Sequence, residues 1–239
     1  MIAVTFQADF ALPKPPHPPD GTVEPRKMLV FHRGRAKDSL IETMFGSRFT
    51  EALCMAAELH SEQRRKSSGV PYVSHVLAVA SLVIENGGTE DEAIAALLHD
   101  AAEDCGGENT LERIRHEFGS RVADIVLGCS DTLESPKPAW RPRKEKYLRH
   151  LESADGSVQL VAIADKLHNL RSTLREHALQ GDAFWLHFRA GREGMLWYFG
   201  ELVRIFRSSA VPSCLVGEFE RAWLELKSQA QPGSVRSLT

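Results

Sequence analysis

The sequence predicts an all-α fold, and three observations carry that prediction. Apolar residues recur at helical spacing in successive segments between residues 49 and 229. Glycine pairs, or clusters of proline and polar residues, separate these segments. No segment alternates apolar and polar residues as a half-buried strand would. The 239 residues are enough for one large domain with a buried core, and no internal repeat is visible.

The first predicted helix begins near residue 49, and a second follows it along the chain. Residues 49–65 carry one stripe of apolar side chains. The members of the stripe are Ala52, Met55, Ala56 and Leu59. A glycine-containing loop over residues 67–72 follows, and then an apolar segment over residues 74–88. Gly87 and Gly88 end that segment and predict a glycine stop, because glycine tolerates left-handed backbone.

The middle of the chain continues the pattern. Thr89 and Glu92 have capping-box spacing, which predicts a helix at the start of residues 89–107, a segment that ends in a second glycine pair. Residues 110–131 predict two more helical pieces, the first opening with a threonine cap. Residues 131–142 predict a loop, because three prolines within seven positions interrupt a helix.

Four further helical segments and two flexible ends complete the predicted organisation. The segments cover residues 143–153, 157–177, 190–209 and 215–229. Residues 1–45 hold six of the twelve prolines and predict a flexible extension. The folded domain is expected over residues 46–228, with a flexible tail over residues 229–239.

Composition excludes several classes of protein. The formal net charge of -3 excludes a protein that is basic overall and coats nucleic acid, so no nucleic-acid partner is expected. No apolar run is long enough to span a membrane, and no secretory signal is visible, so we expect a cytoplasmic protein without membrane contact. The four cysteines contain no CxxC pair, which favours reduced thiols. A monomer and a homo-oligomer both remain open.

A cluster of ionisable groups stands out in HDAAED, residues 99–104. On a regular helix, Glu103 would stack over His99 and Asp104 over Asp100, so that four such groups share one half-apolar face. Packing them against a core without compensation would cost several kcal/mol. A bound cation would remove that cost.

Two further residues in apolar surroundings extend the cluster to a metal site. His75 opens one predicted helix, and Asp165 follows the apolar run VAIA. Two histidines and two carboxylates give a mixed nitrogen and oxygen ligand set. That set suits manganese, iron, or zinc with open water positions better than a closed structural zinc.

Three motifs together resemble one enzyme family. RRKSSGVPYVSH (64–75), HDAAED (99–104) and ADKLHN (164–169) are similar, in the family's order, to the HD-type hydrolase domain of RelA/SpoT homologues. Because no synthetase domain follows, the stand-alone small alarmone hydrolases are the most similar members. The resemblance implies an all-α HD-domain bundle and removal of the 3′-pyrophosphate from the purine nucleotide polyphosphates ppGpp and pppGpp.

The resemblance also assigns the site. It implies that one Mn²⁺ is held by His75, His99, Asp100 and Asp165. It implies that Glu103 and Asp104 position and deprotonate the attacking water. The residues that it assigns to substrate binding are Arg65, Lys66, Arg143, Lys144, Asn169, Ser172 and Tyr198. The family often has RKxGxPY where this chain has the longer RKSSGVPY.

Charge patterning agrees with an anionic substrate. Residues 137–149 contain six basic residues and one acid, whereas residues 85–104 contain seven carboxylates and neither lysine nor arginine. A polyphosphate would need both a cation in the acidic stretch and a basic rim. A solvated, charge-rich loop is the alternative reading of residues 137–149.

Other functions stay open at this stage. The same chemistry on another nucleotide would use the same residues, whether on adenosine alarmones such as ppApp or in removing phosphate from NADPH. A non-catalytic nucleotide-binding module would have lost one of the six metal and acid positions, and none is lost here. An HD-type cyclic-nucleotide phosphodiesterase would explain the HD pair but not RRKSSGVPYVSH.

Overall fold

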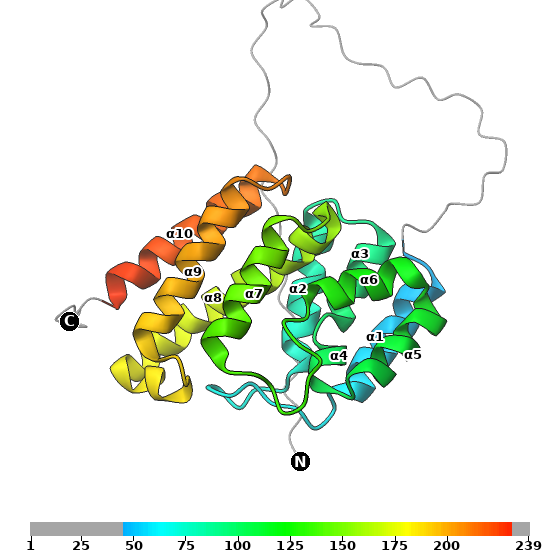
Figure 1. Cartoon of the computed structure of the whole chain (residues 1–239), viewed down its shortest axis with the longest axis horizontal. Helices are drawn as coiled ribbons and strands as arrows, with labels where there is room; N and C mark the ends of the chain where they lie inside the picture. The colour runs from blue at the N-terminus through cyan, green and yellow to red at the C-terminus, as the bar shows by residue number, and fades with distance from the viewer. Residues whose placement is uncertain (1–44, 231–239) are drawn as a thin grey trace, which may run out of the picture. The chain divides into compact units, whose positions relative to one another are not determined.

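A computed structural model gives the structure of residues 45–230, in which helices are the regular elements and one isolated β-bridge joins Arg64 to Pro71. The all-α prediction is therefore confirmed (Figure 1). The elements are α1 (Ser47–Leu59), α2 (Val73–Glu85), α3 (Glu90–Leu98), α4 (Ala101–Asp104), α5 (Glu108–Phe118), α6 (Ser120–Cys129), α7 (Trp140–Glu152), α8 (Gly156–Gln180), the 3₁₀ helix η1 (Gly181–His187), α9 (Gly191–Arg207) and α10 (Ser213–Gln229).

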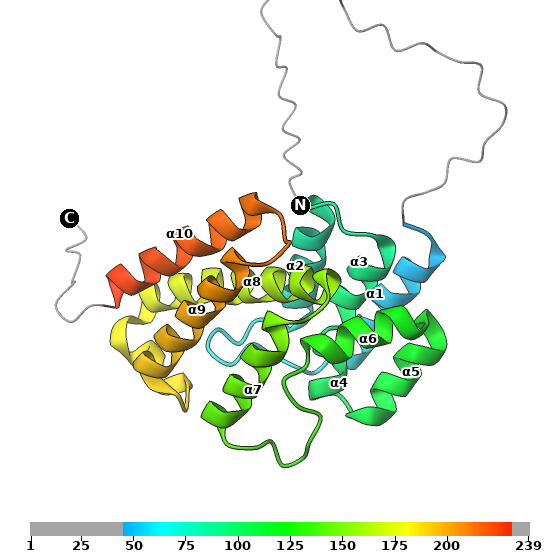
Figure 2. The ribbon, with the colours of Figure 1, turned by 45° about the horizontal axis from the view of Figure 1, so that its top comes forward.

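Helix α8 is the element around which the others pack. Every residue from Ser157 to Asp165 is buried, because this half of the helix is apolar on nearly all sides. Helices α2, α3 and α6 contact α8, and so do α9, α10 and η1 (Figures 1 and 2). Polar groups in the buried half of α8, Asp165 among them, are thereby held in the interior.

The turn between α2 and α3 forms as the sequence predicts. Gly87 has a φ of 81° and donates its N–H to the carbonyl of Ile84, while Gly88 donates to Val83, which closes a Schellman motif. A side chain at Gly88 would clash, because its Cβ would lie 2.4 Å from Val83 Cγ1. Thr89 then caps α3, so the two glycines and the cap fix where α2 ends and α3 begins.

The capping box is confirmed in full. Thr89 N–H donates to the Glu92 carboxylate at 2.7 Å, and Glu92 N–H donates to Thr89 Oγ1 at 3.4 Å. The prediction that one uninterrupted helix follows this cap is wrong, however, because α3 stops at Leu98 and α4 begins at Ala101. Asp100 adopts φ −97° and ψ −6°, which bends the backbone between the two helices.

Two predicted boundaries are also wrong. Helix α1 ends at Leu59 rather than near residue 65, because residues 63–72 pair with themselves: Tyr72 N–H donates to the Gln63 carbonyl and Arg65 N–H to the Val70 carbonyl. Helix α7 begins at Trp140, inside the expected loop. Pro142 fits there because it lies in the first helical turn, where its missing N–H would have no intrahelical partner.

The predicted flexible extension (1–45) and tail (229–239) lie almost wholly outside the described residues. Within residues 45–230 the four cysteines are free thiols, as the sequence predicts. No helix in this part of the chain is long and apolar enough to cross a membrane.

Leu97→Ala should lower the free energy of unfolding by about 2–5 kcal/mol, because Leu97 is fully buried in α3 and its truncation leaves a cavity. Urea unfolding followed by circular dichroism measures the change. Leu186→Ala is the matched control: Leu186 is 87% exposed, so its truncation should change stability by no more than about 0.5 kcal/mol. Equal losses in the two variants would contradict this packing.

Candidate metal centre and active site

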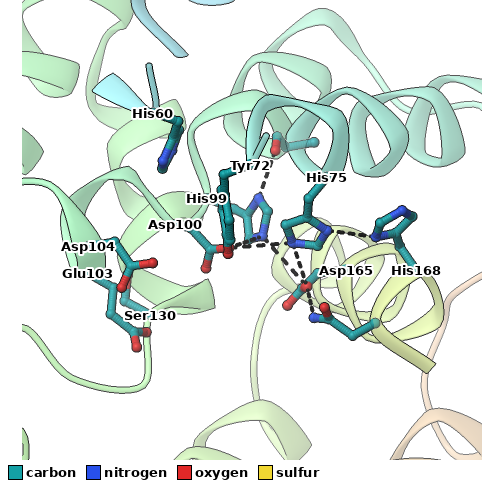
Figure 3. Close-up of polar contacts among 12 residues, drawn as sticks. His60, Tyr72, His75, His99, Asp100, Glu103, Asp104, Ser130, Asp165 and His168 are labelled. Carbon is teal, nitrogen blue, oxygen red and sulfur yellow. Dashed lines mark hydrogen bonds and ion pairs between the residues drawn. The ribbon is translucent and has the colours of Figure 1, made fainter. Parts of the chain in front are cut away.

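Four side chains from three parts of the chain converge on one point (Figure 3). His75 comes from the first turn of α2, His99 and Asp100 from the bend between α3 and α4, and Asp165 from α8. His75 Nε2 lies 3.2 Å from Asp165 Oδ1 and 3.4 Å from Asp100 Oδ2. His99 Nε2 lies 2.9 Å from Asp100 Oδ2 and 3.7 Å from Asp165 Oδ1. The structure therefore brings together all four predicted metal ligands.

The bend at Asp100 is what lets two consecutive residues share this point. Neighbouring side chains on a straight helix point about 100° apart and do not face each other. Here His99 and Asp100 both point inward, and the side chain of Asp100 keeps 21% of its surface exposed. His75, His99 and Asp165 are buried. The centre is thus closed on the protein side and open at Asp100.

The donor set fits a divalent cation. The Nε2 atoms of His75 and His99 are buried and have no hydrogen-bond partner of adequate geometry, although carboxylate oxygens lie close by. His99 Nδ1 lies 2.8 Å from the Ala96 carbonyl, which only accepts, so Nδ1 carries a proton and Nε2 is the nitrogen that would face a bound ion. Two imidazole nitrogens and two carboxylates would be paired by a bound ion.

Charge in the centre already favours a cation. Burial acts to lower the pKa of His99, but the nearby charges of Asp100 and Asp165 outweigh it and raise that pKa well above the usual value. Burial acts to raise the pKa of Asp165, but Lys166 and the two histidines hold it well below the usual range. The two carboxylates therefore stay ionised and favour positive charge between them.

Neighbouring groups fix the orientation of the carboxylates. Tyr72 Oη donates to Asp100 Oδ2 at 2.6 Å. The Asn169 amide donates to Asp165 Oδ1, and Lys166 Nζ donates to Asp165 Oδ2. Such partners of ligand residues hold the ligands in place. Tyr72 belongs to the PYxxH motif, but the sequence did not reveal this role.

His168 is a contact of the centre that sequence reasoning missed. Its Nδ1 lies 2.7 Å from Nδ1 of His75, on the side of His75 away from the carboxylates (Figure 3). Burial and the charges of His75, Arg65 and Arg171 lower the pKa of His168 to about 4. The imidazole of His168 is therefore neutral at pH 7. Its place in ADKLHN, three residues after Asp165, is the signal that was available.

Glu103 and Asp104, the predicted catalytic acids, follow directly in α4 (Figure 3). Lys137 Nζ donates to Glu103 Oε1 at 2.8 Å and to Asp104 Oδ1 at 3.1 Å. The amide of Gln63 donates to Asp104 Oδ2 at 2.9 Å, and its oxygen accepts from the buried imidazole of His60. Both carboxylates are held in defined positions.

Asp131 is a further residue whose role the sequence did not reveal. It accepts from the side chains of Arg143 and Lys144, which lower its pKa to about 2 against the opposing effect of burial. Its backbone N–H donates to Glu103 Oε2 at 3.1 Å. Burial and then the charge of Asp131 raise the pKa of Glu103, against the opposing effect of Lys137. Asp131 thus connects two basic residues to one of the acids.

A cavity of about 950 Å³ lies beside these groups. That volume is at the upper end of the range for small-molecule sites, about 300–1,000 Å³. Asp100, Glu103, Asp104 and Asp165 line it. The predicted substrate-binding residues that also line it are Arg65, Lys66, Arg143, Lys144, Asn169, Ser172 and Tyr198. The structure therefore gathers metal-site carboxylates, acids and basic residues around one space.

Individual contacts in the cavity wall show how these residues are held. Arg65 donates to Asn169 Oδ1 at 2.7 Å, and its guanidinium lies 5.6 Å from the ring centre of Tyr72. Lys144 Nζ lies 5.0 Å from the ring centre of Tyr198, which is buried. The wall thus combines positive charge with aromatic rings.

Comparison with known proteins identifies the class. Residues 52–196 match the family model described as the HD domain. The chain belongs to the HD domain family.

Individual relatives show which proteins this chain is similar to. The guanosine-3′,5′-bis(diphosphate) 3′-pyrophosphohydrolase MESH1 of Xenopus tropicalis is 41% identical over 128 residues, which are 52% of this chain and 69% of that protein. The Homo sapiens protein of that name is 34% identical over 145 residues, 56% of this chain and 78% of that protein. A solved structure described as a metazoan ortholog of SpoT that hydrolyzes ppGpp aligns with a TM-score of 0.63 and 26% identity, over 75% of this chain and 96% of that chain.

Added Mn²⁺ should raise the thermal unfolding midpoint of the protein, because an ion that binds only the folded state stabilises it, by about 2.7 kcal/mol at a hundred times its Kd. Asp165→Asn should remove most of this rise. Differential scanning calorimetry with and without a chelator measures it. Asp124→Asn is the control, since Asp124 pairs with Arg115 on the surface. A full Mn²⁺ response in Asp165→Asn would contradict the site.

Proposed function

We propose that this chain is a metal-dependent hydrolase that removes the 3′-pyrophosphate of ppGpp and pppGpp and releases GDP or GTP and pyrophosphate. The observation that carries the proposal is a cavity lined by Asp100 and Asp165, which contact the buried His75 and His99, together with two further acids and several cations. The similar proteins of Xenopus tropicalis and Homo sapiens are named guanosine-3′,5′-bis(diphosphate) 3′-pyrophosphohydrolases, which supports the same reaction.

One Mn²⁺ is the proposed cofactor, held by His75, His99, Asp100 and Asp165. When bound, the cation would supply Lewis acidity, which polarises a phosphoryl oxygen and lowers the pKa of a coordinated water. Manganese is proposed because a nitrogen and oxygen ligand set with an open side suits it. The open side is that of Asp100, which faces the cavity.

Glu103 and Asp104 are the proposed catalytic residues. Their carboxylates line the cavity one helical turn after the Asp100 bend, so a water between them and the reacting phosphorus would lie within hydrogen-bond reach. A carboxylate there accepts the proton of that water as its oxygen attacks. The raised pKa of Glu103 makes it a stronger base than a solvated glutamate.

The basic residues of the wall are the proposed substrate contacts. Arg65 is hydrogen-bonded to the neutral Asn169, so its charge is not cancelled there, and its planar guanidinium can stack on a purine. Arg143 and Lys144 share Asp131, leaving a net positive charge beside the acids. Lys66, Ser172 and Tyr198 complete the set proposed for nucleotide binding, as the sequence also suggested. We further propose that the enzyme works in the cytoplasm, because its proposed substrates are nucleotides.

The experiment is a substrate panel of ppGpp, pppGpp, ppApp and NADPH, incubated with purified protein and Mn²⁺ and analysed by chromatography. We expect GDP or GTP with pyrophosphate from the guanine substrates. Glu103→Gln and Asp104→Asn should each lower kcat about 10²–10⁴-fold while metal content and fold remain, because each loses proton acceptance. Turnover of the adenine compound or NADPH alone would overturn the substrate, and unchanged kcat in both variants would overturn the catalytic roles.

Lys137→Met should move the acidic limb of the pH–kcat/KM profile to higher pH. Lys137 lowers the pKa of Glu103, so its removal raises that pKa, and the base is then protonated at a higher pH. Lys146→Met is the matched control, because Lys146 loses the same charge from an exposed position on α7. A limb that moves equally in both variants, or not at all in Lys137→Met, would contradict the role of Lys137.

A further inference from the structure

The two ligand histidines are oriented by different kinds of acceptor. His99 Nδ1 faces the Ala96 carbonyl, which lies three residues earlier in the same helix. The corresponding carbonyl for His75 belongs to Tyr72, and it accepts the backbone N–H of His75 at 2.8 Å. His75 Nδ1 instead faces Nδ1 of His168 at 2.7 Å. Nδ1 of His99 thus faces a carbonyl of its own helix, whereas Nδ1 of His75 faces a side chain of another helix, α8.

A hydrogen bond between two Nδ1 atoms has two forms. One nitrogen must carry the proton and the other must accept it with a lone pair. If His75 donates, its proton is on Nδ1 and its Nε2 lone pair points to Asp100 and Asp165. If His168 donates, His75 must carry its proton on Nε2, which then has no lone pair for a metal. Only the first form is compatible with metal binding.

We propose that His168 is a positioning residue for the metal ligand His75, whose Nδ1 proton it accepts so that Nε2 is free to bind the cation. His168 has this role only if the metal site of the proposed function exists. The acceptor need not change its charge, because the role depends on which nitrogen of His75 is protonated. No metal contact of His168 itself is required.

The position of His168 in α8 supports this role. Asp165, His168 and Asn169 are spaced i, i+3 and i+4, so they share one face of the helix. That face supplies a ligand, the acceptor for His75 and the donor to Asp165 Oδ1. The His75 and His168 rings also lie against each other, with centroids 4.8 Å apart. Burial of the adjoining part of α8 fixes the spacing of all three groups.

The test measures Mn²⁺ affinity directly, by competition with a chelating dye, in the full-length protein. His168→Ala should weaken Mn²⁺ binding about 10–100-fold, the usual effect of removing the partner of a ligand histidine. His168→Asn should recover a large part of the loss, because its Oδ1 can occupy the place of Nδ1 and accept the proton. His177→Ala is the matched control: His177 is also a buried histidine of α8, but it packs against Phe184 and Trp185.

The outcomes separate this inference from the proposed function. Unchanged Mn²⁺ affinity in His168→Ala, or an equal loss in His177→Ala, would overturn the role of His168 while the hydrolase proposal stands. A His168-dependent affinity without ppGpp hydrolysis would support the role and overturn the substrate. A wild-type protein that binds no Mn²⁺ would overturn both.

A second measurement does not depend on a variant that folds. Nitrogen-15 NMR of the histidine rings, with diamagnetic Zn²⁺ as the probe, distinguishes the two protonation forms in the wild-type protein. We expect a proton on Nδ1 of His75, bonded to an unprotonated Nδ1 of His168. A proton on Nδ1 of His168 in the Zn²⁺-loaded protein would overturn the proposal.

Discussion

The structure depends on the burial of Asp165 in the apolar half of α8. A carboxylate taken out of water is costly unless charge and hydrogen bonds compensate it. Lys166 and Asn169 of the same helix give part of that compensation, and His75 of α2 and His99 at the end of α3 give the rest. The packing of α2 and α3 on α8 is therefore also what brings the residues of the candidate metal centre together. The packing of these helices and the arrangement of the site therefore depend on the same contacts of Asp165.

Much of this arrangement could be predicted from the sequence, because helical periodicity and glycine stops are local signals. Thr89 with Glu92 and the glycines after α2 show their effect within one turn. The four ligands could be named because buried charged residues are rare in apolar segments and because the family motifs mark them. The bend at Asp100 could not be predicted, since both its neighbours continue as helix. At this bend, Asp100 contacts His75 of α2 and His99 contacts Asp165 of α8, and both partners lie far away in the sequence.

The missed residues share a physical reason. Asp131 and His168 act through partners that are distant in the sequence: Asp131 reaches Glu103 and two side chains of α7, and His168 reaches His75 in α2. An aspartate or a histidine at these positions does not by itself indicate such a partner. The contacts become visible only in the folded structure. The wrongly predicted helix boundaries have a local origin instead. Pro142 does not end the loop as predicted, because a proline disrupts the interior of a helix but not its first turn.

The cations of the cavity are largely paired with its acids, and this pairing bears on how a polyphosphate would enter. Lys137 holds Glu103 and Asp104, while Arg143 and Lys144 hold Asp131. A phosphate group competes for the same cations and offers them more negative charge than one carboxylate. Drawing Lys137 away from Glu103 removes the interaction that lowers the pKa of that acid. An anionic substrate would then make the Glu103 carboxylate more basic, so that the residue proposed to take the proton of the attacking water is most basic when the cavity is filled.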